Sequence, residues 1–234
     1  MKDPVMPVTR PSVQSVKPSD VVMPAFDGKP QAKKRGRREV KALETRKALF
    51  AAAAVVVGKY GYEEASITKI TDQAGVANGT FYNYFETRQD LFDQLLPSIG
   101  GQLLEYIAGR LDQNLTGVDR ERARIVTYFE FFQKNSGFLR ILNEAEVYAP
   151  AAFRQHIQNF AVRYVKALDK QRRNGELNGF DEDELTAVAY MLMGVRTYLT
   201  MLWRSNPGAA KKGVDQSYIS TYMKLVEQGL FVRK

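Results

Sequence analysis

The segment from Ser66 to Phe85, which reads SITKITDQAGVANGTFYNYF, concentrates small polar and tyrosine side chains that a helix could present to a partner. Amide, hydroxyl and phenol groups of this kind hydrogen-bond to base edges and phosphates when a helix enters a major groove about 12 Å wide. The segment is therefore predicted to contact double-stranded DNA. The candidate contact residues are Thr68, Asn78, Gly79, Thr80, Tyr82, Asn83 and Tyr84.

Two short helices joined by a tight turn are expected to position these side chains. The first is predicted over residues 67–74, with Ser66 as its N-cap and with one apolar face. Gly75 permits the turn, because glycine adopts backbone angles that other residues avoid. The second helix is predicted over residues 78–85, where two phenylalanines four residues apart anchor it on the domain.

The flanking sequence supplies two longer helices. Apolar residues recur at helical spacing from Leu43 onward, and Gly61 is expected to end this helix. A further helix is predicted to begin near Arg88. Pro97 should kink or break that helix, because proline cannot donate a backbone hydrogen bond.

The run from Thr45 to Leu96 resembles the DNA-binding domain of the tetracycline-repressor (TetR/AcrR) family. The matching pieces are TRKALFAAAAVVVGKYGY, SITKITDQAGVANGTFYNYF and ETRQDLF, in this order and spacing. A helix-turn-helix alone would be a weak signal, whereas one with both flanking helices in register is specific. The rest of the chain fits the family only in its length and helical character.

The resemblance implies a role for each candidate contact. Thr68 would touch a phosphate or a base edge, and Gly79 and Thr80 would bind phosphate at the N-terminus of the second helix. Asn83 would read a base directly, because its amide can pair bidentately with adenine.

Three further residues are implied to contact the DNA backbone. Tyr82 and Tyr84 would do so through their hydroxyl groups, although both could instead pack the small domain. Arg88 would stand where the family often has a phosphate-binding lysine. The sequence departs from the family pattern at Ala77, where serine or threonine would cap the second helix. Asn78 could supply the cap instead, and would then not read bases.

A basic run, KKRGRREVK at residues 33–41, precedes these helices. It holds six basic residues against one acid, in a chain whose formal net charge is +8. The run is either a solvated charge cluster or a DNA-contacting arm that uses Arg35, Arg37 and Arg38. Residues 1–40, with six of the nine prolines, are predicted to be a flexible tail that ends in this basic arm.

Five more helices are predicted near residues 119–134, 138–148, 151–174, 182–204 and 215–231. No stretch shows the period-2 alternation of a strand, so the predicted fold class is all-α. We expect three parts. A tail covers residues 1–40, a three-helix helix-turn-helix domain covers 41–92, and a larger helical ligand-binding and dimerisation domain covers 93–234.

The third part is rich in aromatic and methionine residues, which either form an ordinary core or line an apolar cavity. Arg163 and Arg196 lie among apolar residues. If buried, each needs an anion, from a glutamate of the protein or from a ligand. His156 is a cavity residue or, by default, a surface residue. The candidate ligand contacts are Phe129, Phe132, Phe160, Arg163, Tyr164, Met193 and Arg196.

The last two predicted helices carry broad apolar stripes that a single helix pair covers poorly. Two copies related by a two-fold axis would form a four-helix bundle. Such a homodimer would also place two reading helices about 34–36 Å apart, as successive major grooves require. The candidate interface residues are Leu192, Leu199, Tyr222 and Leu225.

The scarcity of some residue types limits the alternatives. The chain has no cysteine and one histidine, so neither a disulfide, nor a metal centre, nor a cofactor is expected. No nucleophile–base pair with a recognisable spacing is present, which disfavours an enzyme. No apolar run is long enough to span a bilayer, so we expect a cytoplasmic protein without a membrane partner.

Together these features favour a ligand-responsive transcriptional regulator, acting as a repressor. It would bind a palindromic DNA operator as a homodimer and be released by a small, largely apolar effector. The alternatives are an architectural protein that binds DNA without sequence preference and, less favoured, a small-molecule enzyme on a helical scaffold.

Overall fold

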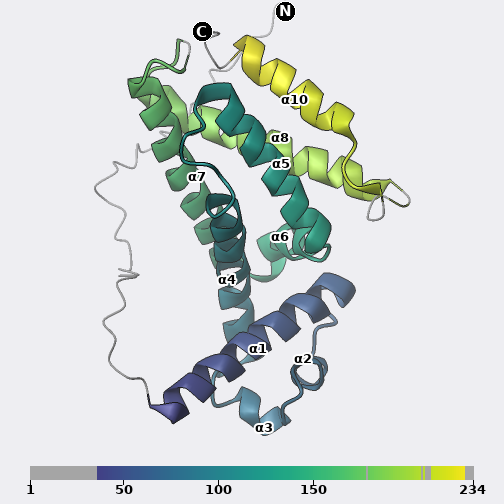
Figure 1. Cartoon of the computed structure of the whole chain (residues 1–234). Helices are drawn as coiled ribbons and strands as arrows, with labels where there is room; N and C mark the ends of the chain where they lie inside the picture. The colour runs from purple at the N-terminus through teal and green to yellow at the C-terminus, as the bar shows by residue number, and fades with distance from the viewer. Residues whose placement is uncertain (1–35, 178, 207, 209–211, 230–234) are drawn as a thin grey trace, which may run out of the picture. The chain divides into compact units, whose positions relative to one another are not determined.

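The computed structural model describes residues 36–177, 179–206, 208 and 212–229 (Figure 1). The chain divides into two compact units, Met1–Val40 and Lys41–Lys234. The helices are α1 (Arg37–Tyr60), α2 (Ile67–Ala74), α3 (Asn78–Phe81), α4 (Arg88–Ala108), α5 (Gly117–Lys134), α6 (Phe138–Tyr148), α7 (Pro150–Arg173), the 3₁₀ turn η2 (Glu182–Glu184), α8 (Leu185–Ser205) and α10 (Gln216–Gly229). The described residues contain no extended strand, which confirms the all-α prediction.

Aromatic rings hold the first helices together. Phe50 of α1 meets Phe85 edge to face with ring centroids 5.2 Å apart, and Tyr62 meets Phe92 of α4 at 4.8 Å. All four rings are buried, so burial of large apolar area fixes these short helices. The arrangement gives α2 and α3 a rigid base on α1 and the first half of α4.

Three predicted helix ends of this part are confirmed. The Ser66 hydroxyl accepts a hydrogen bond from the Lys69 backbone N–H at 3.2 Å, as an N-cap does. Gly75 ends α2 with φ at +68°, a left-handed conformation that favours glycine. Gly61, with φ at +87°, follows the last residue of α1.

The helix α4 continues through Pro97 to Ala108, so of the two predicted effects of this proline, a kink or a break, the break is wrong. The neighbouring turns compensate for the backbone hydrogen bond that proline cannot donate, because their apolar side chains are buried on both sides of Pro97. The expected boundary between residues 92 and 93 therefore lies inside a single helix, which extends from the α1–α3 group into the helices that follow (Figure 1).

The helices predicted for the rest of the chain are present: α6 has the predicted range 138–148, and the others begin within three residues of the predicted positions. One difference has a clear local cause. Asp181 and Glu184 form a reciprocal capping box around η2, and α8 therefore begins at Leu185 rather than near residue 182. Phe138 and Phe132 pack edge to face at 5.2 Å, which ties α6 to α5.

The basic arm extends into a helix. Because α1 begins at Arg37, the predicted tail is already helical before residue 40, and Arg38 lies exposed in the first turn. Residues 1–35 of the proposed tail, Arg35 among them, lie outside the described residues, and so does the side chain of Arg37.

One helix of the described residues, Glu182–Ser205, is long and apolar enough to cross a membrane by length and composition alone. Its apolarity has another explanation. One face of α8 is buried against the chain's own core, and the opposite face carries an exposed apolar stripe. The exposed residues of this stripe are Tyr190, Met191, Tyr198, Met201 and Leu202.

Candidate DNA interface and ligand cavity

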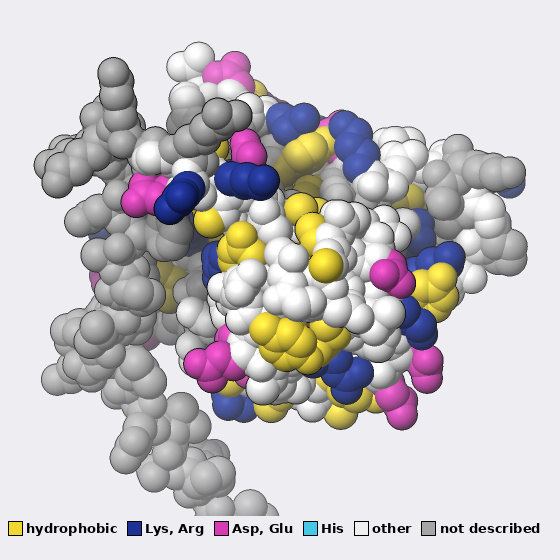
Figure 2. All heavy atoms as spheres, turned by 90° about the horizontal axis from the view of Figure 1, so that it is seen from below, with side chains coloured by type: hydrophobic (Ala, Val, Ile, Leu, Met, Phe, Trp, Pro, Cys, Tyr) yellow, Lys and Arg dark blue, Asp and Glu magenta, His cyan; other side chains and the backbone are white. Residues whose placement is uncertain are grey.

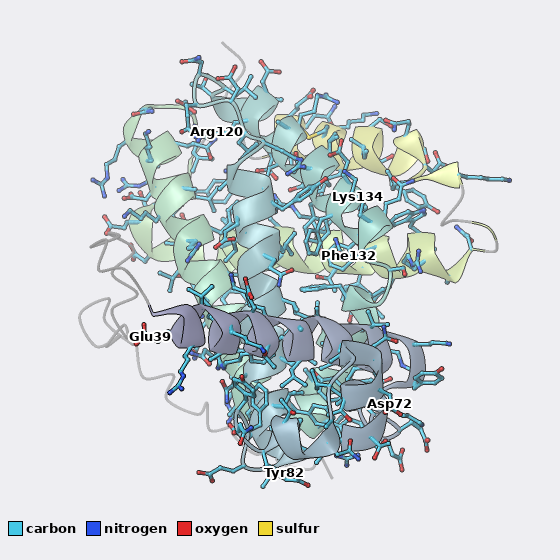
Figure 3. All side chains as sticks on the ribbon, turned by 60° about the horizontal axis from the view of Figure 1, so that its bottom comes forward. Glu39, Asp72, Tyr82, Arg120, Phe132 and Lys134 are labelled. Atoms are coloured by element: carbon cyan, nitrogen blue, oxygen red, sulfur yellow. The ribbon has the colours of Figure 1, made fainter. Side chains whose placement is uncertain are left out.

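The α3 segment presents polar and aromatic groups to solvent. Tyr82 is 60% exposed, and its side chain points away from the domain (Figure 3). Asn83 and Gly79 are exposed, whereas Thr80 and Tyr84 are half-buried. Figure 2 views the molecule from this side and shows hydrophobic patches set in uncharged polar surface, with both basic and acidic side chains around them. This surface matches what a helix needs to approach base edges and phosphates.

The helix α3 is shorter than expected. It comprises four residues, Asn78–Phe81, and Tyr82 to Tyr84 follow in a turn. Asparagine, glycine and threonine at its start are poor helix formers, which accounts for the short span. The Thr80 carbonyl still accepts the Asn83 N–H at 3.2 Å, so the turn remains tightly wound and keeps Asn83 on the exposed side.

Asn78 does not cap α3, because the N-cap position is Ala77 and no side chain bonds there. Its amide nitrogen instead donates to the Thr68 hydroxyl at 3.4 Å, and its amide oxygen lies against the Thr71 hydroxyl. Two candidate DNA contacts therefore bond to each other and connect α2 to α3. Any base contact by Asn78 would have to be made with the remaining donor of its amide nitrogen or the second lone pair of its amide oxygen.

Arg88 is exposed at the start of α4, and its guanidinium is partly occupied. It donates to the Glu63 carbonyl at 3.1 Å and lies over the Phe92 ring. These contacts fix the side chain beside the loop between α1 and α2. Its free N–H groups remain suited to phosphate.

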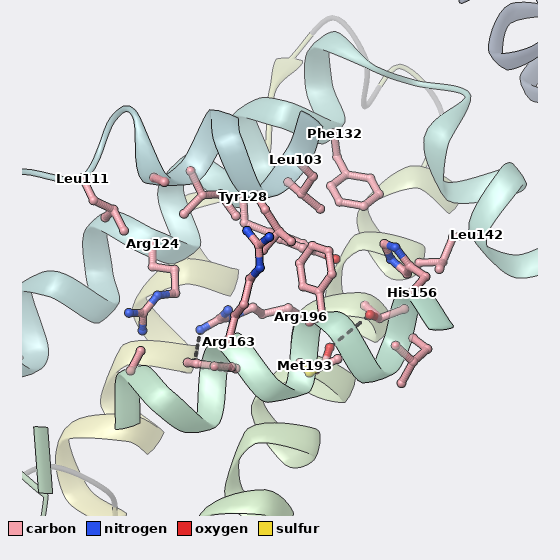
Figure 4. A pocket seen from close by; sticks show the side chains of 18 of the residues that line it. Leu103, Leu111, Arg124, Tyr128, Phe132, Leu142, His156, Arg163, Met193 and Arg196 are labelled. Carbon is pink, nitrogen blue, oxygen red and sulfur yellow. Dashed lines mark hydrogen bonds between the residues drawn. The ribbon is translucent and has the colours of Figure 1, made fainter. Parts of the chain in front are cut away.

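A cavity of about 290 Å³ lies between α4, α5, α6, α7 and α8 (Figure 4). Six of the seven residues proposed as ligand contacts line it: Phe132, Phe160, Arg163, Tyr164, Met193 and Arg196. Phe129 is the exception, because its buried ring faces Trp203 at 6.0 Å on another side of α5. The cavity also has lining residues that were not proposed as ligand contacts: Leu103, Ile107, Arg120, Arg124, Tyr128, Phe138 and Leu142, together with His156, for which a cavity position was one of the two alternatives.

A buried ion cluster borders the cavity. Glu121 is fully buried and pairs with Arg196 and Arg124, and its carboxylate also accepts from Tyr164 at 3.0 Å and Tyr222 at 2.6 Å. An intramolecular ion pair was one of the two alternatives for Arg196. Arg163 differs, because it is exposed at the cavity.

The cluster is ionised. Burial opposes charge on Glu121, but the guanidiniums of Arg196 and Arg124 and the tyrosine hydroxyls outweigh it and lower the pKa of the carboxyl. Burial also opposes charge on Arg196, yet the Glu121 carboxylate raises the pKa of this guanidinium well above its ordinary value. Burial raises the pKa of Tyr164 to about 12, so this phenol stays protonated and acts as a donor.

His156 is buried at the other end of the cavity, so its default placement on the surface is wrong. Its ring packs on the Phe160 ring at 4.8 Å and against the backbone of Gly100 in α4. A Cβ atom added at Gly100 would lie 2.2 Å from His156 Nδ1. Only glycine leaves room for the imidazole at this crossing of α4 and α7.

This crossing predicts opposite effects at two adjacent glycines. Gly100→Ala should lower the free energy of unfolding by about 1–3 kcal/mol, because the methyl group overpacks the buried ring. Gly101→Ala should raise it by about 0.5–1 kcal/mol, because nothing lies within 4 Å of the added Cβ and alanine favours a helix interior. Urea unfolding of both variants checks this, and equal effects of the two would contradict the packing argument.

The end of α1 is fastened to α6. Arg140 donates to the Lys59 carbonyl at 2.8 Å and to the Tyr60 carbonyl at 3.1 Å. The Glu144 carboxylate accepts from Arg140 Nε at 2.6 Å and from the Tyr62 N–H at 2.9 Å. The last carbonyls of α1 therefore find their partners on a helix that also lines the cavity.

The same junction brings two backbones together. A Cβ atom on Gly58 of α1 would lie 2.7 Å from the Cα atom of Gly137, directly before α6. Phe138 and Leu142 of α6 face the cavity. A shift of α6 would therefore be transmitted directly to α1, because no flexible side chain separates the two backbones.

The four proposed dimer residues do not share one surface. Leu192 and Tyr222 are buried within the chain, and the Tyr222 hydroxyl belongs to the Glu121 cluster, so their assignment to a dimer interface is wrong. Leu199 is half-buried, and Leu225 is 61% exposed. Helical phase explains the error, because the apolar residues of α8 surround most of the helix and do not reveal which side faces the core.

This geometry defines the class. A helix-turn-helix is joined by one continuous helix to a helical domain that contains a cavity, and this is the architecture of a one-component transcriptional regulator. Residues 49–95 match the sequence model of "Bacterial regulatory proteins, tetR family". Residues 49–95 therefore carry a DNA-binding domain of the TetR type, and the chain is similar to transcriptional regulators of that family.

Similar proteins agree with this assignment. The fatty acid metabolism regulator protein of Bacillus subtilis is 29% identical over 50% of this chain and 61% of its own length, so the chain spans less than two thirds of that relative. The nucleoid occlusion factor SlmA of Mannheimia succiniciproducens is 24% identical over 62% of this chain and 69% of its own length.

Solved structures share the fold. The transcriptional regulator FadR of Bacillus subtilis, solved in complex with stearoyl-CoA, covers 78% of this chain and 98% of its own with a TM-score of 0.66 at 20% identity. The TetR regulator TylP of Streptomyces fradiae covers 82% of this chain and 89% of its own, also with a TM-score of 0.66, at 23% identity.

Proposed function

We infer that the protein is a ligand-responsive repressor that binds a palindromic DNA operator as a homodimer and is released when an effector enters the cavity. The observation that carries this is the continuous helix α4. This helix packs with the helix-turn-helix of α1–α3 through Leu91 and Phe92, and it lines the cavity through Leu103 and Ile107. The protein would act in the cytoplasm and catalyse no reaction.

The exposed stripe of α8 supports the homodimer. Met191 is 67% exposed and Tyr198 is 72% exposed, one above the other along one helix face, and Leu225 of α10 is also an exposed apolar residue. Patches of this kind on a soluble protein mark interaction sites. A two-fold pairing of α8 and α10 would cover the stripe and set the distance between the two α3 segments.

Two of the helices that line the cavity also contact the helix-turn-helix part of the chain. One is α4, and the other is α6, which holds the end of α1 through Arg140 and Glu144. An effector that fits better when α4 and α6 have shifted would favour a spacing of the two α3 segments that does not match the operator. DNA affinity then falls by population shift.

Asn83→Ala should weaken operator binding by about 5- to 150-fold, which corresponds to about 1–3 kcal/mol for a bidentate base contact. The preference over random DNA should fall as well. Fluorescence anisotropy at one fixed salt concentration, on an operator selected from random DNA, measures both. Asn159→Ala, an exposed asparagine of α7, is the matched control and should bind like the wild type. Wild-type affinity and selectivity of Asn83→Ala would refute the base-reading role.

A second candidate is an architectural protein that binds DNA without sequence preference; the observation behind it is the similarity to a protein named as a nucleoid occlusion factor. Random DNA would then compete as well as a selected operator in the same assay. The cavity argues for the regulator, because an architectural protein has no need for one.

A further inference from the structure

The lining of the cavity carries positive charge without matching negative charge. Four arginines line it, namely Arg120, Arg124, Arg163 and Arg196, and its described lining contains no acid. Glu121 lies behind the wall and is the carboxylate shared by Arg124 and Arg196. Among the described residues, no carboxylate lies within ion-pair distance of Arg120 or Arg163.

The buried residues beside the cavity also carry an excess of positive charge. Two buried guanidiniums share one carboxylate, which leaves one positive charge without a counterion. Tyr164 and Tyr222 do not supply it, because burial raises the pKa of both phenols and keeps them neutral. A buried charge without a partner is costly, so this end of the cavity is suited to an anion from outside the chain.

The opposite end is apolar. Figure 4 shows Leu111, Arg124 and Arg163 towards one side, and Phe132, Leu142 and His156 towards the other. His156 carries no charge at neutral pH, because burial lowers its pKa to about 4. A ligand that fills the cavity therefore meets arginine side chains at one end and apolar side chains at the other.

We propose that the cavity binds an anionic amphipath, with its acidic group at the arginines and an unbranched apolar chain directed towards Phe138, Leu142 and His156. This rests on the proposed function, in which the cavity is the effector site, and it replaces a largely apolar effector with a charged one. The volume of about 290 Å³ lies near the lower end of the ~300–1,000 Å³ of ligand pockets, which favours a chain of medium length.

Calorimetric titration of the full-length protein with four compounds that share a ten-carbon chain and differ in their head group tests the proposal. Decanoate carries a carboxylate, decyl phosphate carries a phosphate, decanoyl-coenzyme A carries its phosphates beyond a thioester, and decanol is neutral. At least one anion should bind ten times or more tighter than decanol, because charge-assisted hydrogen bonds are the strong ones. The tightest of the three identifies the source of the acidic group.

Variants locate the acidic group. Arg163→Met and Arg120→Met should each reduce anion affinity about tenfold and leave decanol affinity unchanged. Arg154→Met, an exposed arginine on α7 that does not line the cavity, is the matched control and should change neither. Thermal unfolding of each variant checks that the fold is intact.

Three outcomes would overturn the proposal: equal binding of decanol and the anions, equal effects of Arg154→Met and the two cavity variants, or no binding of any compound. Operator binding by the ligand-free protein is measured separately. Failure of the anion proposal with intact operator binding would leave the DNA-binding regulator in place, whereas loss of specific DNA binding would contradict the regulator itself.

Discussion

Replacing Glu121 by glutamine should lower the free energy of unfolding by about 3–5 kcal/mol, because it leaves two buried guanidiniums without their shared carboxylate. The loss exceeds that of ordinary core substitutions, which are centred near 1 kcal/mol. Both tyrosine hydroxyls would also lose a charged acceptor. Denaturant unfolding at neutral pH measures the change.

Two variants make this experiment specific. Glu130→Gln changes an exposed glutamate of the same helix and should alter stability by less than about 0.5 kcal/mol. The double variant Glu121→Gln/Arg196→Met removes one of the two unpaired charges and should recover a large part of the loss. Either of two results would show that the ion cluster does not hold α5 to α8. One is that Glu121→Gln is as stable as Glu130→Gln. The other is that the double variant loses as much stability as the single variants Glu121→Gln and Arg196→Met lose together.

The helix-turn-helix could be predicted from the sequence because its signals are local. Ser66 caps α2 through a bond to a residue three positions later, and Gly75 ends it through its own backbone angle. The bond between Asn78 and Thr68 could not be predicted in this way, because it joins two helices whose relative placement depends on the whole domain. The helices that carry the candidate interface residues could thus be predicted, whereas the contacts between these residues could not.

The cavity was only partly predictable. Aromatic residues and arginines in apolar helices pointed to Phe132, Phe160 and Arg196, but the same pattern also included Phe129, which faces the opposite side of α5. A usable signal for the ion cluster was present. Glu121 lies on the same helical face as Tyr128 and Phe132, so an acid shares a face with two large aromatic residues and requires a buried partner.

The pH dependence of stability should reveal the buried histidine. Burial lowers the pKa of His156 from its ordinary 6.5 to about 4, so the unfolded chain takes up a proton at a pH where the folded protein does not. The contribution of this residue is therefore fully present above pH ~6.5 and is lost as the pH falls towards 4. By pH ~4.5 the loss should reach roughly 2–3 kcal/mol, since one pKa unit corresponds to about 1.4 kcal/mol.

The matched variant is His156→Leu, which keeps an apolar side chain at the position and does not titrate. Carboxylates also titrate in this range, but they are common to both proteins, so the difference in unfolding free energy isolates the imidazole. No other histidine is present in the chain to confuse the comparison. The wild type should lose stability relative to His156→Leu between pH ~6.5 and ~4.5. A constant difference across this range would mean that the imidazole is protonated as easily in the folded protein as in the unfolded chain, and hence that the far end of the cavity is open to water rather than apolar.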